Sequence, residues 1–209
     1  MAIATQQSVK KTPLAKLGRI LPWILIICGI IGVVASLVIT SEKFALAENP
    51  NHQTMCDINP IISCGSVMKS DQAHAFGFMN TYIGLVGFPI VITTGMAMLA
   101  GARFKRWWWI GMQVGLTFGI AFAYWLLWQS MYRLHALCPW CLSVDVALPI
   151  SFWYVTLYNF YHGNLRLPER LKPLGRFVKR HHVDILLVGF LIVIAVILHH
   201  FWYYFGQNL

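Results

Sequence analysis

Two pairs of cysteines are the residues of this chain whose type and spacing could do chemistry. Cys56 and Cys64 lie in a polar segment, and Cys138 and Cys141 bound a Cys-Pro-Trp-Cys sequence where a hydrophobic stretch begins. A thiolate attacks a disulfide through a mixed-disulfide intermediate, so pairs that meet can exchange two electrons at a time. If the fold brings the two pairs together, the four thiols can relay two electrons.

The Cys-Pro-Trp-Cys sequence predicts a reactive thiol at Cys138. Pro139 suits the first position of a helix, where its missing N–H costs nothing, and this places Cys138 near the N-cap. Unpaired N–H groups and the positive end of the helix dipole favour a thiolate there. The spacing keeps both sulfurs on neighbouring turns, within reach of a disulfide, and puts Cys141 deeper in the hydrophobic stretch.

Each pair also has a plainer interpretation. Cys-x-x-Cys is a spacing of zinc ligands, and the four cysteines together could close a structural zinc site. The loop pair, with Asn59 and Pro60 marking a turn between its ends, could be a static disulfide that staples an exposed segment. The presence of both pairs in one chain favours redox exchange. Cys28 lies among isoleucines in an apolar stretch and is expected to pack as a small hydrophobic residue.

The elements that must position these thiols are membrane spans. Of the 209 residues, 58% are hydrophobic and 11% are charged, which is far from the composition of a soluble domain. A bilayer core needs about 20 apolar residues per helix. The predicted spans cover residues 20–41, 77–102, 107–132, 138–161 and 185–205, with a cytoplasmic tail at 1–19 and an outer loop at 42–76. The fold class is therefore all-α and integral to a membrane, in one domain over 20–205.

The distribution of basic residues predicts the orientation. Lys and Arg are retained on the cytoplasmic side, and all 16 except Lys43, Lys69 and Arg133 fall in the N-terminal tail or in the second and fourth connections. This places the N-terminus in the cytoplasm, and the C-terminus and both cysteine pairs outside, where disulfides persist. The net charge of +9 is assigned to contact with anionic lipid rather than nucleic acid. Phe201 and the aromatic residues after it are assigned to the membrane interface.

The motifs around the cysteines resemble those of the vitamin K epoxide reductase family, in particular its bacterial members that make disulfide bonds. The resemblance covers most of the first four spans. It rests on the loop from Cys56-Asp57 through Ser63-Cys64-Gly65-Ser66-Val67-Met68, on Ser70, on Phe76-Gly77-Phe78, on Asn80 to Gly84 and on Cys138-Pro139-Trp140-Cys141. The order of the pairs agrees, since the other known family of membrane disulfide oxidases carries Cys-x-x-Cys in the first outer loop.

The resemblance implies a fold and a role for each cysteine. The fold would be a four-helix transmembrane bundle around a quinone site, with a peripheral fifth helix and the outer loop as a cap. Cys56 and Cys64 would be the shuttle pair that oxidises a partner. Cys138 would be the active-site thiol that receives the electrons of the shuttle, and Cys141 the thiol that faces the quinone.

Two further residues match quinone-site positions of the family. Asn80 would hydrogen-bond a quinone carbonyl, and Ser70 would lie near the mouth of the pocket. The residues alone favour plainer roles, because an Asn at the start of a helix is often a cap and a Ser beside a loop is usually solvated.

Asp145 is a departure from the family pattern. Animal members carry a tyrosine four residues after the second active-site cysteine, where this chain has Asp145. An ionisable residue inside a span is a functional candidate, here as a proton donor to the reduced quinone, or else a carboxyl group neutralised within the bundle. A second departure is the absence of the thioredoxin-like domain that some bacterial members carry fused. The thiol partner is therefore expected to be a separate thioredoxin-like, disulfide-forming protein in the outer compartment.

These features together predict a membrane thiol oxidoreductase that supports disulfide bond formation. It would reoxidise the partner and reduce a membrane quinone of the menaquinone, ubiquinone or phylloquinone type, in a bacterial inner membrane. Two alternatives stay open: a quinone epoxide reductase, and a non-enzymatic membrane scaffold with structural disulfides. A scaffold predicts disulfides that are inert to a thioredoxin-like donor. An assay of epoxide reduction with a dithiol separates the epoxide reductase from the quinone-reducing oxidoreductase.

Overall fold

The structure, a computed structural model, describes residues 13–49, 51–59, 61–165, 177–178 and 180–202. In this part of the chain all the long elements are helices, and the only β-bridge, between Ile62 and Leu137, belongs to no strand. The predicted tail at 1–19 is described only from Pro13, where it is already helical. Most basic residues of the fourth connection lie outside the described residues.

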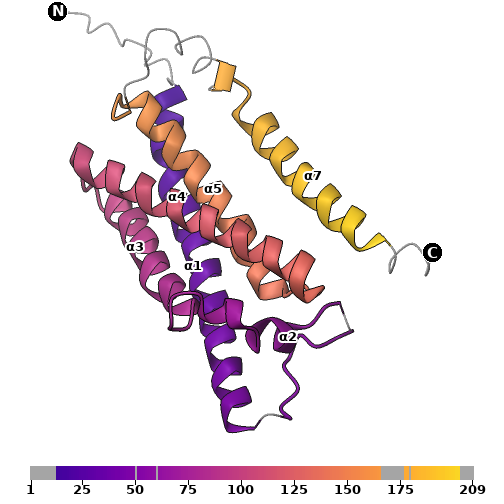
Figure 1. The fold of residues 1–209 in the computed structure, drawn as a ribbon. Coiled ribbons are helices and arrows are strands. Elements are labelled where there is room, and N and C mark those ends of the chain that lie inside the picture. Colours follow the sequence, from indigo (N-terminus) through magenta and orange to yellow (C-terminus); the bar gives the residue numbers. More distant parts are fainter. Residues whose placement is uncertain (1–12, 50, 60, 166–176, 179, 203–209) are drawn as a thin grey trace, which may run out of the picture.

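Five described helices are long and apolar enough to cross a membrane, which confirms the predicted all-α membrane fold. They are α1 (Pro13–Glu48), α3 (Thr81–Leu99), α4 (Arg106–Gln129), α5 (Pro139–Tyr161) and α7 (His182–His200) (Figure 1). The first helix continues beyond its predicted end at Ser41, because the residues that follow, Glu-Lys-Phe-Ala-Leu-Ala-Glu, are mostly good helix formers. The predicted outer loop therefore starts with helix, and it also contains α2 (Cys64–Met68) and the 3-10 helix η1 (Asp71–His74).

Four of the helices form a bundle in which α1 packs along both α3 and α5, and α5 also packs against α4 (Figure 1). Its core contains Leu21 of α1, Phe88 of α3, Trp109 of α4 and Val155 of α5. Small residues let membrane helices approach closely, and a Cβ atom added at Gly95 of α3 would lie only 2.7 Å from a backbone carbonyl oxygen of α1. The close contact of α1 with α3 thus depends on glycine.

The fifth helix, α7, is peripheral, as predicted: it stands apart from the bundle in Figure 1, and none of its residues is buried. The residue after it behaves differently. Phe201 is fully buried among Ile61, Leu127, Met131 and Leu137. The ring of Phe201, which the sequence assigns to the membrane interface, therefore packs against protein side chains, among them Ile61 of the loop that carries the first cysteine pair.

A short irregular segment joins α4 to α5 and returns the chain to the bundle. The π-helix η2 (Ser130–Leu134) extends α4, and His135 then adopts a left-handed conformation with φ of 51°. The hydroxyl of Ser130 donates a hydrogen bond to the carbonyl oxygen of Ala136. This tight reversal places Cys138 at the N-cap of α5, at the same end of the bundle as α2. We call this end the cysteine end.

Candidate functional site

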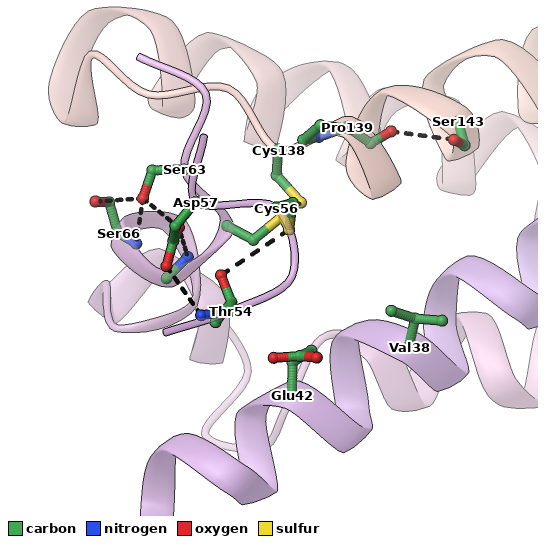
Figure 2. The surroundings of a disulfide bond; sticks show 12 residues. Val38, Glu42, Thr54, Cys56, Asp57, Ser63, Ser66, Cys138, Pro139 and Ser143 are labelled. Atoms are coloured by element: carbon green, nitrogen blue, oxygen red, sulfur yellow. Dashed lines mark hydrogen bonds between the residues drawn. A yellow bond between two sulfur atoms is a disulfide. The ribbon is translucent and has the colours of Figure 1, made fainter. Parts of the chain in front are cut away.

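The two cysteine pairs meet at the cysteine end of the bundle. Cys56 and Cys64 form a disulfide, while Cys138 and Cys141 are free thiols. The sulfur of Cys138 lies 3.0 Å from the sulfur of Cys64 and points at the disulfide (Figure 2). A thiol that touches one sulfur of a disulfide is placed for exchange with that sulfur. The arrangement therefore joins Cys64, rather than Cys56, directly to Cys138.

A carboxylate organises the loop that carries the first pair. Asp57 accepts hydrogen bonds from the backbone N–H of Thr54 (3.1 Å), the hydroxyl of Ser63 (2.8 Å) and the backbone N–H of Gly65 (3.0 Å) (Figure 2). Partial burial raises the pKa of Asp57, but these hydrogen bonds outweigh it and leave the pKa below its ordinary value. The charged carboxylate thus ties the residues beside Cys56 to those beside Cys64.

The loop is also bonded to the segment before α5. The backbone N–H of Leu137 donates to the carbonyl oxygen of Ile61 (2.6 Å), and the N–H of Ser63 donates to the carbonyl oxygen of Leu137 (3.1 Å). These bonds flank the isolated bridge between Ile62 and Leu137. Cys64 follows shortly after the bridge in one segment, and Cys138 follows directly after it in the other. The register of this bridge places the two sulfurs in contact.

The start of α5 favours the thiolate of Cys138, as the sequence predicts. Cys138 is the N-cap residue, with extended backbone, and Pro139 occupies the first turn. The pKa of Cys138 is lowered, chiefly by a hydrogen bond from the Cys141 thiol. The backbone N–H groups of Cys141 and Trp140 lower it further, against burial and the charge of Asp57, which raise it. The start of α5 thus favours ionisation of Cys138.

A cavity of about 900 Å³ opens beside the second pair and lies between α1, α3, α4 and α5. Cys138 and Cys141 both line it. Neighbouring helices of the bundle pack together, but α3 and α4 face each other across the cavity without such packing. The cavity walls are mostly apolar, and the polar residues among them gather towards the cysteine end: Ser36, Lys43, Ser70, Gln72, Asn80, Thr81, Tyr82, Gln129, Ser130 and Asp145.

The shape and lining of this cavity fit a quinone. Pockets of 300–1,000 Å³ hold small organic molecules, and apolar walls with a few polar groups at one end suit a polar ring with an apolar tail. The ring end would then lie beside Cys141, and the tail along the apolar faces of α3 and α4. The residues present are therefore compatible with the quinone site that the sequence predicts.

Asn80 and Ser70 line the cavity, but their polar atoms also serve the cysteine end of α3. The side-chain N–H of Asn80 donates to the carbonyl oxygen of Gln72 (2.7 Å), and its oxygen accepts from the backbone N–H of Ala75 (3.2 Å). Asn80 is the N-cap residue of α3, but its side chain makes no cap hydrogen bond. Ser70 donates to the carbonyl oxygen of Val67 (2.7 Å). A quinone contact by either residue remains a prediction.

Asp145 is buried and lines the same cavity from α5, one helical turn beyond Cys141. A carboxyl group at this position can exchange a proton with a molecule in the cavity, or stay neutral within the bundle. Its role as a proton donor remains a prediction.

The sulfurs of Cys56, Cys64 and Cys138 all lie within 4.8 Å of one another, a spacing that could hold a metal ion. Zinc binds thiolates, and two of these three sulfurs form a disulfide. Cys141, the fourth cysteine of the zinc alternative, is not in this cluster. The arrangement is therefore that of thiol–disulfide exchange.

Two residues of the site received no role from the sequence. Asp57 was part of a motif, and its three-way hydrogen bonding is visible only once the loop is folded. Lys43 entered only the charge count, yet it is buried in the cavity wall. The sequence feature that could have indicated a buried position for Lys43 is its place near the end of a helix whose preceding turns are apolar.

Comparison with known proteins finds similar sequences. The profile of the Vitamin K epoxide reductase family matches residues 23–156, a range that includes every predicted site residue. The chain is also 25% identical over 120 residues to vitamin K epoxide reductase complex subunit 1 of Mus musculus. That match covers 54% of this chain and 74% of the mouse protein.

Proposed function

Because this chain belongs to the vitamin K epoxide reductase family and is therefore a membrane oxidoreductase of thiols and quinones, we propose that it oxidises protein thiols and reduces a membrane quinone. The observation that carries the proposal is the contact of 3.0 Å between the sulfurs of Cys64 and Cys138, beside a cavity that Cys141 also lines. One pair can thereby exchange with the other, and the second pair can meet a molecule from the bilayer.

The relay starts at the loop disulfide. A thiolate of the reduced partner attacks Cys56, releases Cys64, and is resolved by the second thiol of the partner, which leaves the partner oxidised and both loop cysteines reduced. The thiolate of Cys64 then attacks Cys138 in a Cys138–Cys141 disulfide, and Cys56 resolves this bond. Two electrons have now reached Cys138 and Cys141. The described arrangement, with the loop pair closed and the second pair reduced, matches this stage.

The last step returns the second pair to its disulfide. A quinone in the cavity supplies an acceptor for two electrons and two protons. Cys138 and Cys141 lie on one turn of α5, so their sulfurs can close the bond as the electrons leave. The apolar walls of the cavity exclude water from this step. Because α3 and α4 face each other across the cavity without packing together, the space between them leaves room for an apolar tail.

The partner is proposed to be a separate thioredoxin-like protein in the outer compartment of a bacterial inner membrane, with the N-terminus of this chain in the cytoplasm. Two apolar side chains beside Cys56 support a protein partner: Met55 is 80% exposed and Ile58 is 73% exposed. Exposed apolar side chains around a reactive group mark contact sites. Replacing both with Ser should slow oxidation of a protein dithiol and leave oxidation of dithiothreitol unchanged.

The function is tested with the purified protein, dithiothreitol as donor and a soluble short-chain quinone as acceptor, with loss of quinone absorbance as the readout. Wild-type protein should turn over, and Cys141→Ser should abolish quinone reduction. Cys28→Ser is the matched control, because Cys28 is buried in α1 away from the relay, and it should keep full activity. Undiminished turnover in Cys141→Ser would sink the mechanism.

Epoxide reduction is the second candidate, and the observation that favours it is the similarity to the mouse vitamin K epoxide reductase subunit. Both reactions would use the same thiols and the same cavity. Supplying a quinone epoxide in place of the quinone separates them. Oxidation of the dithiol by the quinone but not by the epoxide supports the proposed function, and the reverse result supports the alternative.

A further inference from the structure

Lys43 is a buried cation that the exchange between cysteines does not use. It lies near the end of α1, is 9% exposed, and lines the cavity that Cys141 also lines. Ile39, one helical turn earlier, packs in the same cluster as Cys138 and Cys141. A buried ammonium group is costly without compensating interactions, so its place in the wall of the cavity that the reactive thiols also line calls for a role.

Lys43 is connected to solvent through a second ionisable side chain. Its Nζ atom lies 3.3 Å from Nδ1 of His74, the last residue of η1. His74 is exposed, whereas its neighbours Gln72 and Ala73 line the cavity. The two side chains therefore run from the cavity wall to the surface, and both can gain and release protons.

Hydrogen bonds of the η1 segment fix the position of His74. The backbone N–H of Asn80 donates to the carbonyl oxygen of Ala73 (3.1 Å), and the side chain of Asn80 is bonded to Gln72 and Ala75. These three bonds hold η1 at the cavity wall, which Gln72 and Ala73 line. Asn80 thus keeps the imidazole of His74 against the end of α1.

The chemistry of the second pair leaves a proton to be supplied. Closing the Cys138–Cys141 disulfide releases two electrons, and reduction of a quinone to a quinol takes up two protons. When Cys138 reacts as a thiolate, its own proton has already gone to solvent, so Cys141 brings only one. The second proton must reach the cavity from another group.

We propose, on the premise of the proposed function, that Lys43 and His74 deliver this second proton from the outer solvent. Lys43 transfers a proton from Nζ to an oxygen of the quinone as Cys138 and Cys141 close their disulfide. Thiolate, thiol, ammonium and quinone become disulfide, amine and quinol, with two electrons and two protons transferred. His74 then passes a proton from water to the neutral Lys43 amine.

Of the other ionisable groups around Lys43, one is paired elsewhere and the rest line the cavity. Glu42, the preceding residue, pairs with His52 of the loop at 3.0 Å. Tyr82 of α3 and Asp145 of α5 line the cavity, as do the two thiols of α5. Asp145 is the competing donor, but no hydrogen bond in the described residues links it to an exposed ionisable side chain.

Substitutions at Lys43 test the donor itself. Lys43→Met removes the proton, and Lys43→Arg keeps the charge and the hydrogen-bond donors but does not release a proton at neutral pH. We expect both to slow single-turnover quinone reduction by about 100-fold, the usual scale of general acid catalysis. Lys69→Met is the control, because Lys69 is exposed and does not line the cavity, and it should keep the wild-type rate.

Two readouts separate proton delivery from a structural role. Dithiothreitol should reduce the Cys138–Cys141 disulfide of both Lys43 variants at the wild-type rate without quinone, as read by alkylation. Binding of the short-chain quinone, read by quenching of tryptophan fluorescence, should also be retained. Loss of either property would show that Lys43 holds the site together, and would overturn the proposal. A wild-type rate in Lys43→Arg would reduce Lys43 to a fixed charge and overturn it too.

Chemical rescue tests the surface end of the path. His74→Ala should slow quinone reduction, and imidazole added to the buffer should restore the rate, because small proton carriers reach an exposed site. Imidazole should not restore Lys43→Met. A His74→Ala variant with the wild-type rate, or one that imidazole does not rescue, would overturn the path. If wild-type protein itself reduces no quinone, the proposed function fails, and that result is distinct from failure of the Lys43 variants alone.

Discussion

The contact of 3.0 Å between the sulfurs of Cys64 and Cys138 predicts which mixed disulfide the relay passes through. In a variant with both Cys56→Ser and Cys141→Ser, each pair keeps only the thiol that faces the other pair. No thiol of either pair remains to resolve a bond between them. We expect mild oxidation with diamide to close a Cys64–Cys138 disulfide in nearly every molecule.

The geometry sets the scale of this effect. A thiol held within about 5 Å of another has an effective concentration on the order of 1 M, before any gain from orientation. A monothiol in solution at about 1 mM is then at a disadvantage of about 1,000-fold in competing for the bond. The Cys64–Cys138 disulfide should therefore persist in millimolar glutathione.

The assay is alkylation with a maleimide of high mass, followed by peptide mapping under non-reducing conditions. The matched variant, Cys64→Ser with Cys141→Ser, keeps Cys56 and Cys138. We expect it to close its bond more slowly, since Cys64 is the residue in contact with Cys138. Faster closure of Cys56–Cys138 would refute the exchange order, and so would failure of the first variant to form an internal disulfide.

Three further substitutions test the support around the site. Asp57→Asn should speed reduction of the loop disulfide by a phosphine about fivefold at neutral pH, equivalent to about 1 kcal/mol after solvent screening is allowed for. Folding lowers the pKa of Asp57, so the stabilisation that its carboxylate gives the loop is present above the unfolded pKa of about 4 and is lost as the pH falls through the folded pKa. A difference in reduction rate between Asp57→Asn and wild type that persists in acid would contradict the prediction. Phe201→Ala removes a fully buried ring and should lower the free energy of unfolding by about 3 kcal/mol, whereas Trp202→Ala, at a residue 61% exposed, should lower it little. Thermal unfolding in detergent, followed by circular dichroism, measures both. Equal shifts for the two variants would count against the burial of Phe201. Gly95→Ala should lower the free energy of unfolding by about 2 kcal/mol, because the added methyl group meets the α1 backbone. Gly189→Ala is the control, because its methyl group meets no atom within 4 Å. Equal stability of the two variants in the same measurement would show that α1 and α3 can separate without penalty.

The sequence by itself determined the membrane architecture and the identity of the reactive groups. Long apolar stretches can satisfy their backbone only as helices in a bilayer, so five spans were predictable from composition. The Cys-Pro-Trp-Cys sequence likewise predicted Cys138 as N-cap residue of α5, because proline at the first helical position is a local signal. The family was recognisable from its motifs, and the match over residues 23–156 confirms it.

Boundaries and cap contacts were less predictable. Helix α1 continues past the predicted end of the first span at Ser41, because helix-forming residues follow the apolar stretch that marked the span. Phe201 was assigned to the interface, because an aromatic residue after a span looks the same in sequence whether it meets lipid headgroups or a protein cap. The hydrogen bonds of Asn80 to the η1 segment were also not predictable from the sequence, because they form only when the loop before α3 folds back on itself.

Only the tertiary structure decided which sulfur meets which. Four cysteines allow several exchange partners, and local spacing cannot choose among them. The bridge between Ile62 and Leu137 brings Cys64 to Cys138 through long-range backbone hydrogen bonds. The cavity that Lys43 and Cys141 share forms between helices distant in the chain. Chemical identity is a local property of the sequence, whereas contact between these groups depends on how the helices and the loop pack.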